Sequence, residues 1–384
     1  MEKWAAIIKQ SETILSHVFK ENSVFLLFHD DADGCCAAAI LLNLISKQTA
    51  YTLLDFASPE KHSVELTPGL LNKIHRKKPK FIISVDLALT SSVEKIKTLL
   101  SFLGARMLIY DHHVQSKSIR WPERCIHINP FKFNLGNIPA SYYSYLLYKH
   151  YTKENDACWV GAVGAVADYR AEECRGLLEE VSHRYPSFYP FKTFDQPTAL
   201  RSPLMAMAYL VNAGYQHSDH SGAQVAVEAL NEALQLGDPT VLLEGKTEKA
   251  AMLQRFLREV NKELRKSLAQ FNSKAEFHLD SRIAFYSIKP KFNITSQIAT
   301  QLQHSNPKAI IAVISPETQK TTKVSLRRGG MMKTDLAALA ESTTSGLFQA
   351  SGGGHQEAAG CVLRNEDVDL WKKNALEHIR RVKS

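Results

Sequence analysis

Short apolar runs alternate with amphipathic segments over the first third of the chain. The runs at residues 24–28, 51–56, 81–85 and 106–110 predict buried strands. Helical spacing lies at residues 4–19, 35–45, 68–75 and 92–100. Strands that are apolar throughout need cover on both faces, so this order predicts an α/β fold with a parallel sheet between two layers of helices.

The rest of the chain is first helical and then alternating again. Helices are expected at residues 141–151, 159–167, 203–211 and 223–234, a loop or lid at 184–197, and one long helix over 246–271. Strands at 282–288, 309–314 and 322–327, with helices at 296–303, 335–341 and 367–380, predict a second, smaller α/β unit. We therefore expect a sheet domain (1–170), a helical insert with a connecting helix (171–274) and a C-terminal domain (275–384).

Composition and charge narrow the class of protein. The chain carries 47 Lys/Arg against 39 Asp/Glu, a formal charge of +8, and residues 276–384 hold 15 Lys/Arg against 10 Asp/Glu. A basic surface attracts polyanions, although a generally basic protein would show the same excess. The six cysteines have no zinc-ribbon spacing, and no signal peptide or apolar run long enough for a membrane helix is present. These features predict a cytoplasmic protein with reduced thiols and no membrane contact.

The first candidate motif follows the strand at 24–28. The sequence His29-Asp30-Asp31-Ala32-Asp33-Gly34 places several carboxylates at what would be the carboxyl end of a parallel strand, where ligands gather in open α/β sheets. Crowded carboxylates repel one another unless cations neutralise them, and hard divalent ions prefer such oxygen ligands. A solvated acidic loop is the simpler alternative.

Two further strands end in similar groups. Asp86 follows the run at 81–85, and Asp111-His112-His113 follows the run at 106–110. A helical segment rich in Gly and Ala ends at Asp168. One such aspartate would be taken for a helix cap or a solvated end. Carboxylates and imidazoles delivered to one sheet edge by three strands instead predict a metal centre.

A glycine run near the C-terminus is the last candidate. Gly352, Gly353 and Gly354 precede His355, and consecutive glycines can turn their N–H groups inward to bind an anion. Arg327 ends a predicted strand nearby in sequence, and its guanidinium suits phosphate oxygens. A surface loop without a ligand is the alternative.

Taken in order, these motifs resemble those of the DHH–DHHA1 phosphoesterase superfamily, most closely its archaeal RecJ-like single-strand exonucleases. The matching residues are His29, Asp31, Asp33 and Gly34 in the first motif, Asp86 in the second, Asp111, His112 and His113 in the name-giving third, Asp168 in the fourth, and Gly352, Gly353, Gly354 and His355 in the DHHA1 signature. The resemblance makes residues 1–170 the DHH catalytic domain and 275–384 the DHHA1 substrate-binding domain. From its 384 residues we expect the chain to lack a counterpart of the extra oligonucleotide-binding domain of bacterial RecJ.

The resemblance also implies a mechanism with two divalent ions, Mn²⁺ preferred and Mg²⁺ possible. One ion would be held by His29, Asp31 and Asp86, and the other by Asp33, Asp86, His112 and Asp168, with Asp86 bridging. Asp111 would orient the neighbouring imidazoles, and His113 would face the phosphate. Gly352, Gly353, Gly354, His355 and Arg327 would hold the substrate.

Three functions remain open at this point. The first is an exonuclease on single-stranded DNA or RNA. The second is a phosphodiesterase for short oligonucleotides (nanoRNase-type), cyclic dinucleotides or 3′-phosphoadenosine phosphate. The third is a replication scaffold that binds GINS-like partners. The full set of expected ligands argues against a protein that has lost catalysis.

Overall fold

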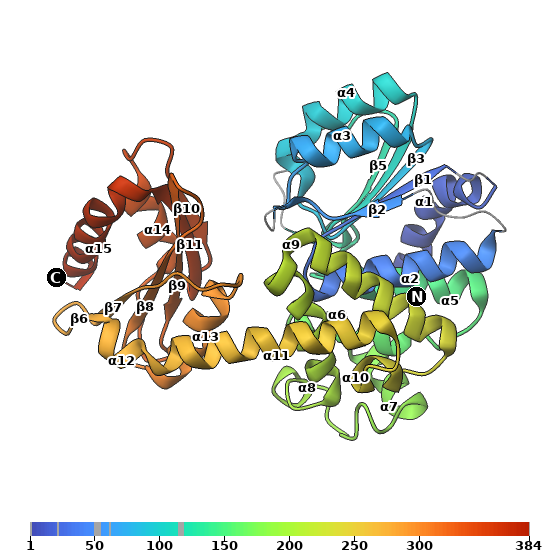
Figure 1. Ribbon diagram of the computed structural model, residues 1–384. Coiled ribbons are helices and arrows are strands. Elements are labelled where there is room, and N and C mark those ends of the chain that lie inside the picture. The colour runs from blue at the N-terminus through green and yellow to red at the C-terminus, as the bar shows by residue number, and fades with distance from the viewer. Residues whose placement is uncertain (1, 21–22, 50–54, 61–62, 114–118, 384) are drawn as a thin grey trace. The chain divides into compact units, whose positions relative to one another are not determined.

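The computed structural model describes residues 2–20, 23–49, 55–60, 63–113 and 119–383 of the 384-residue chain. The chain forms two compact units, Met1–Arg258 and Glu259–Ser384 (Figure 1). Each unit has its own sheet and its own hydrophobic core. The boundary falls inside the predicted long helix, which is α11 (Glu248–Ala269).

Among the described residues of the N-terminal unit, five strands form one sheet in the order β2-β1-β3-β4-β5. They are β1 (Val24–Phe28), β2 (Asp55–Ala57), β3 (Phe81–Val85), β4 (Arg106–Tyr110) and β5 (Cys125–Ile128). All neighbours pair in parallel, which confirms the predicted parallel sheet. The expected strand at 51–56 lies partly outside the described residues, and β5 was not predicted.

Helices cover both faces of this sheet because side chains alternate along each strand. In β1, Phe25 and Leu27 face α3 (Pro68–Lys77) and α4 (Val93–Leu103), whereas Leu26 and Phe28 face the larger core. That larger core contains α1 (Glu2–Val18), α2 (Ala32–Gln48), α5 (Ala140–Thr152) and α6 (Cys158–Ala167) (Figure 1). In α2, 13 of the 17 residues are buried, so this helix has almost no solvent face.

The segment after α6 is helical, as predicted. It consists of α7 (Arg175–Arg184), α8 (Gln196–Ala199), α9 (Pro203–Leu236) and α10 (Thr240–Glu244), followed by α11. The two helices expected at 203–211 and 223–234 are both present within α9, where they are joined by a kink at the non-helical residues Ser218 and Asp219. No helix in the described part of the chain is both long and apolar enough to cross a membrane.

Within residues 259–383, six strands form the second sheet in the order β10-β11-β9-β8-β7-β6. They are β6 (Glu276–His278), β7 (Ile283–Ser287), β8 (Ile310–Pro316), β9 (Thr321–Arg328), β10 (Ser351–Gly354) and β11 (Ala358–Arg364). The pair β7–β8 is parallel and the other pairs are antiparallel.

This sheet is also covered on both faces. Ile311 and Val313 of β8 pack into the core that includes α11, α12 (Phe271–Lys274) and α13 (Thr295–Ser305). Ile310 and Ile314 of the same strand pack into the core of α14 (Leu336–Thr344) and α15 (Val368–Lys383). The predicted second α/β unit is therefore confirmed.

The glycines predicted to bind an anion lie in a strand. Gly352, Gly353 and Gly354 belong to β10 and pair with β11. A Cβ on Gly352 would lie 2.3 Å from the carbonyl oxygen of Ala340 in α14, and Gly354 has φ +142°. Glycine is required here because β10 packs against a helix backbone and ends in a conformation that other residues rarely adopt.

A candidate metal centre at the carboxyl ends of three strands

Three neighbouring strands deliver the predicted ligands to one edge of the first sheet. Strands β1, β3 and β4 are adjacent and parallel, so their carboxyl ends meet. The sheet hydrogen bonds continue one residue further, from the N–H of His29 to the carbonyl of Val85 (3.3 Å) and from the N–H of Asp86 to that of Tyr110 (2.9 Å). The ladder thus fixes the backbone of the site as firmly as the strands themselves.

A tight turn places the first motif between β1 and α2. Asp31 caps α2, and its carboxylate accepts a hydrogen bond from the N–H of Gly34 (3.1 Å). A Cβ on Gly34 would lie 2.1 Å from the carbonyl oxygen of His29. Only glycine allows so close an approach, which leaves the side chains of His29, Asp31 and Asp33 beside one another.

Asp86 lies at the centre of the cluster. One carboxylate oxygen is 3.0 Å from Nε2 of His112, and the other is 3.6 Å from Nδ1 of His29. Burial acts to raise the pKa of Asp86, but hydrogen bonds to the two imidazoles outweigh it and lower this pKa. The same contacts overcome the effect of burial on His112 and raise its pKa to about 10. Asp86 has φ +62°, which Asp tolerates better than most residues.

Asp33 and Asp168 place two further carboxylates beside His112, 3.9 Å from Nε2 and 3.8 Å from Nδ1 respectively. The carboxylate of Asp33 accepts hydrogen bonds from the N–H groups of Ala140 (2.7 Å) and Ser141 (3.0 Å) at the start of α5. Burial, and then Asp86 and Asp168, raise the pKa of Asp33. Burial also raises the pKa of Asp168 to about 7. The buried Oδ2 of Asp168 has no hydrogen-bond partner among the described residues.

The two histidines of the third motif have different surroundings. His112 is 4% exposed and faces Asp86, whereas the side chain of His113 is 44% exposed. Asp111 is fully buried and accepts hydrogen bonds from Nδ1 (2.6 Å) and the backbone N–H (3.1 Å) of His113. The ring of His113 is therefore held at Nδ1, which leaves Nε2 as its other hydrogen-bonding position.

The donor set fits two divalent cations. Ligand atoms of His29, Asp31 and Asp86 lie within 4.8 Å of one another, and so do those of Asp86, His112 and His113. Asp86 belongs to both groups, as a bridging carboxylate would. Oxygen and imidazole ligands suit Mn²⁺ or Mg²⁺, and the orphaned oxygen of Asp168 beside crowded carboxylates calls for added positive charge. His113, assigned above to the phosphate, also lies in the second group, on its exposed side.

Sequence reasoning missed a polar pair beside His112. The side-chain amide of Asn137 lies between Nδ1 of His112 and the guanidinium of Arg170. Since a guanidinium only donates, the amide oxygen must face Arg170 (2.6 Å to Nη2, 3.2 Å to Nε), and the NH₂ group faces His112. Arg170 also lies 3.7 Å from Asp168. Its position two residues after Asp168 was the available signal, whereas nothing in the sequence marks Asn137.

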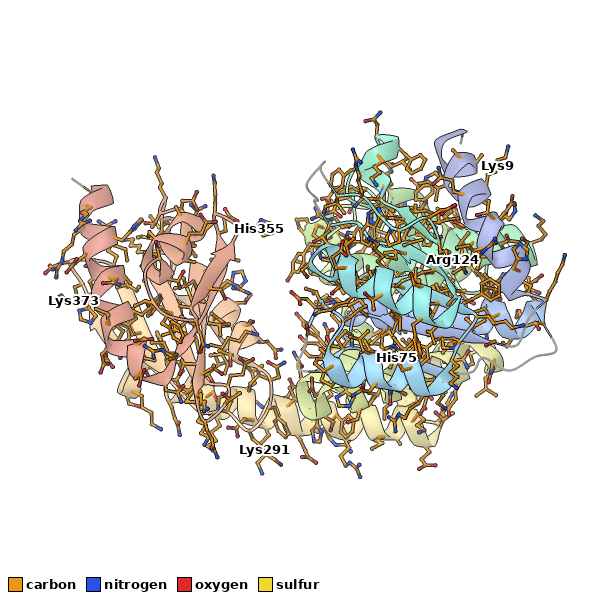
Figure 2. All side chains as sticks on the ribbon, turned by 90° about the horizontal axis from the view of Figure 1, so that it is seen from above. Lys9, His75, Arg124, Lys291, His355 and Lys373 are labelled. Carbon is orange, nitrogen blue, oxygen red and sulfur yellow. The ribbon has the colours of Figure 1, made fainter. Side chains whose placement is uncertain are left out.

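The predicted substrate residues lie together in the C-terminal unit. Arg327 of β9 pairs with Ala358 of β11, and Gly354 of β10 pairs with Ala359. The guanidinium of Arg327 donates to Oγ1 of Thr300 (3.1 Å). His355 follows directly, and its side chain projects from the ribbon of this unit (Figure 2). All these residues are at the same end of the second sheet.

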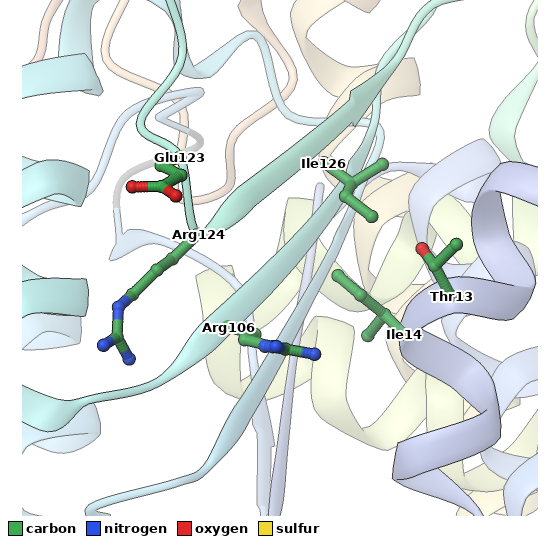
Figure 3. A pocket seen from close by; sticks show the side chains of 6 residues that line it. All are labelled: Thr13, Ile14, Arg106, Glu123, Arg124 and Ile126. Atoms are coloured by element: carbon green, nitrogen blue, oxygen red, sulfur yellow. The ribbon is translucent and has the colours of Figure 1, made fainter.

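A separate cavity of about 360 Å³ lies where β4 and β5 begin, at the end of the first sheet opposite the cluster. It is lined by Thr13, Ile14, Arg106, Glu123, Arg124 and Ile126. The two arginine side chains point in different directions (Figure 3). The guanidinium of Arg124 donates a hydrogen bond to the carbonyl of Gly104. This cavity contains none of the predicted ligands.

Residues 282–382 match the family model of the DHHA1 domain. This match lies within the C-terminal unit. No curated protein matches the chain in a sequence comparison. Solved structures do match over almost its full length, and they show that the chain has the fold implied by the predicted resemblance.

Three of these structures show the fold. RecJ from Thermus thermophilus, in complex with Mn²⁺, is 15% identical to this chain with a TM-score of 0.72. The match covers 97% of this chain and 55% of the Thermus RecJ chain. An exonuclease RecJ bound to manganese is 15% identical with a TM-score of 0.69, covering 97% and 94%. The DHH domain of a protein assigned to a family of ribosomal proteins is 16% identical with a TM-score of 0.73, covering 98% and 91%. The chain thus has the DHH-family phosphoesterase fold and spans 55% of the length of the Thermus RecJ.

Proposed function

We propose that this protein is a phosphodiesterase that uses two divalent metal ions, Mn²⁺ in preference to Mg²⁺, and acts as an exonuclease on single-stranded nucleic acid. The observation that carries this proposal is the position of Asp86, shared by the groups His29–Asp31–Asp86 and Asp86–His112–His113. A single ion would need only one such group. Imidazole in both groups favours Mn²⁺.

The candidate ligands divide between the two ions. His29 and Asp31 would hold one ion, Asp33, His112 and Asp168 the other, and Asp86 both. Two divalent ions in such a site activate water and stabilise the charge of an in-line displacement at phosphorus. Asn137 and Arg170 orient His112 and Asp168, since partners behind the ligands fix their geometry.

His113 is the candidate proton donor. Asp111 accepts the hydrogen at Nδ1, so Nε2 is the position from which His113 can donate to a phosphate oxygen or to the leaving oxygen. The exposed fraction of its side chain, 44%, leaves room for that contact. A donor aimed at developing negative charge stabilises the transition state more than the ground state.

A nucleic-acid substrate is supported by the charge of the DHHA1 domain. Residues 276–384 carry 15 Lys/Arg against 10 Asp/Glu. Arg327 and His355 lie at one end of its sheet, where a phosphate could be held. GINS-like partners and a cytoplasmic location stay predictions.

The decisive experiment is cleavage of end-labelled single-stranded DNA and RNA, long and short, with Mn²⁺. We expect stepwise loss of nucleotides from one end of long strands, abolished in Asp86→Asn and retained in Asp369→Asn, an exposed aspartate of α15. Activity confined to oligomers of a few nucleotides would replace the exonuclease with the small-substrate phosphodiesterase. Inactivity on every strand would overturn the proposal.

A further inference from the structure

A second cavity, of about 680 Å³, lies in the DHHA1 domain away from the glycine run. Its walls come from β6, from the turn that follows it, from the loop between α13 and β8, and from Met331. Phe277, Leu279 and Met331 are 47%, 84% and 64% exposed. Three large apolar side chains gathered around one groove are unfavourable on a surface that faces water. Such a patch therefore indicates a binding site.

The groove is positively charged. Arg282 and Lys308 line it, and neither makes a hydrogen bond or ion pair through its side chain with any described residue. His278 also lines it, and no carboxylate is among the described lining residues. Unpaired cations beside an exposed aromatic ring are the combination that binds single strands, because bases stack on the ring while phosphates meet the charges.

The local backbone does not account for Arg282. This residue has φ +51° and closes a turn in which its N–H donates to the carbonyl of Leu279 (3.1 Å). Glycine or asparagine is the usual residue for that conformation. An arginine there is unfavourable for the turn, and it places a cation at the edge of the groove.

The groove lies at the same end of the second sheet as the residues predicted to bind phosphate, which include Arg327 and Gly354. Along that end, Phe277 of β6 pairs with Ala284, Ala284 with Ile311, and Ile311 with Arg327. Gly354 of β10 lies two strands beyond β9. Four strand spacings separate β10 from β7, which is about 19 Å at about 4.8 Å each. A ligand that reaches from Gly354 to Arg282 must therefore be several nucleotides long.

We propose that the groove lined by Phe277, Arg282 and Lys308 is a second nucleotide subsite, which holds the continuing single strand when its terminal phosphate is bound near Arg327 and His355. This inference rests on the proposed function and makes it more specific, because it selects a polynucleotide over a dinucleotide as the substrate. A peptide is a poorer occupant, since β6 offers only three residues for strand pairing.

The test uses the full chain and fluorescent oligothymidylates of graded length, up to about 12 nucleotides, which is within the range that one single-strand site covers. Binding is measured by polarisation in EDTA, and cleavage is measured with Mn²⁺. The variants are Arg282→Asn combined with Lys308→Gln, and Phe277→Leu. Asparagine tolerates the positive φ, and leucine keeps the contact of residue 277 with Phe271 while removing the aromatic face.

The matched control is Lys289→Gln combined with Lys320→Gln. It removes the same charge at the opposite end of the sheet, after β7 and before β9. For Arg282→Asn/Lys308→Gln we expect about tenfold weaker binding of long strands, and a salt dependence smaller by about 1.4 in log–log slope, at about 0.7 for each lost phosphate contact. The ratio of kcat/KM on the longest strand to kcat/KM on a dinucleotide should also fall about tenfold in this variant. In the control, the ratio should stay unchanged.

Long strands bound equally well by the groove variants and wild type would overturn the subsite while leaving the exonuclease intact. A wild type that neither binds nor cleaves long strands would instead refute the proposed function itself. If the control loses as much binding as the groove variants, the loss reflects net charge alone. That result would also overturn the subsite.

Discussion

The carboxylate of Asp111 lies 2.6 Å from Nδ1 of His113. Nε2 of His112, the other histidine of the motif, lies 3.0 Å from Asp86 instead. The two imidazoles are therefore held by different carboxylates, one behind the candidate proton donor and one among the candidate metal ligands.

Asp111→Asn should separate chemistry from metal binding. The amide keeps the shape of the carboxylate but loses the charge that holds His113, so we expect kcat to fall about 10- to 100-fold. Mn²⁺ affinity, measured by calorimetry, should stay close to that of wild type. An equal loss in Mn²⁺ affinity would show that Asp111 acts on the ions instead.

Asn137→Ala should show the opposite division. Its amide is the link between His112 and Arg170, so His112 loses its orientation when the link is removed. We expect Mn²⁺ affinity to fall about 10- to 100-fold, with kcat largely recovered at saturating metal. Unchanged affinity in Asn137→Ala would contradict the assignment.

Gly34→Ala should destabilise the fold even without metal. The added Cβ meets the carbonyl of His29 at 2.1 Å, and backbone cannot yield as a side chain can. We expect the free energy of unfolding to fall by about 1–3 kcal/mol, measured with urea in EDTA. In Gly176→Ala the Cβ has open space, and this substitution in α7 should be neutral or stabilising.

A histidine outside the candidate site should give a measurable pH dependence. Burial, and then Lys132, lower the pKa of His127 to about 4. The unfolded chain takes up this proton near pH 6.5, so this contribution to stability is complete above pH 6.5 and is lost as the pH falls towards 4. Lys132→Met removes an ammonium 3.1 Å from Nδ1 and should raise this pKa. NMR titration, with His127→Asn to assign the signal, measures both; a pKa near 6.5 in wild type would disprove the shift.

The elements that sequence predicted well are those with a strong local signal. β1 and β3 are apolar throughout, and such strands are buried in a parallel sheet by necessity. Because parallel strands share one carboxyl edge, the fold class predicted that His29 and Asp86 lie at the same edge of the sheet. That β1 and β3 are neighbours is known only from the structure. β5 was missed because its four residues include His127 and give no periodicity.

The remaining features depend on contacts between distant segments. Asn137 contacts His112 although the two residues are 25 positions apart in the sequence, and the residues around each of them give no sign of this contact. The lack of a side chain on Gly352 also allows close packing against the backbone of Ala340, which the sequence did not predict, and anion binding by Gly352 stays a prediction. A glycine run signals close approach, and only the tertiary structure shows what approaches.

The burial of α2 has a consequence for how the candidate site moves. Asp31 and Asp33 stand at the start of a helix with 13 of its 17 residues inside the core. A segment without a solvent face cannot fray by itself, so its amide hydrogens should exchange only when the whole N-terminal unit opens. The first motif is therefore coupled to the cooperative unfolding of its unit, and any residue whose volume disturbs α2 can alter the candidate site from a distance.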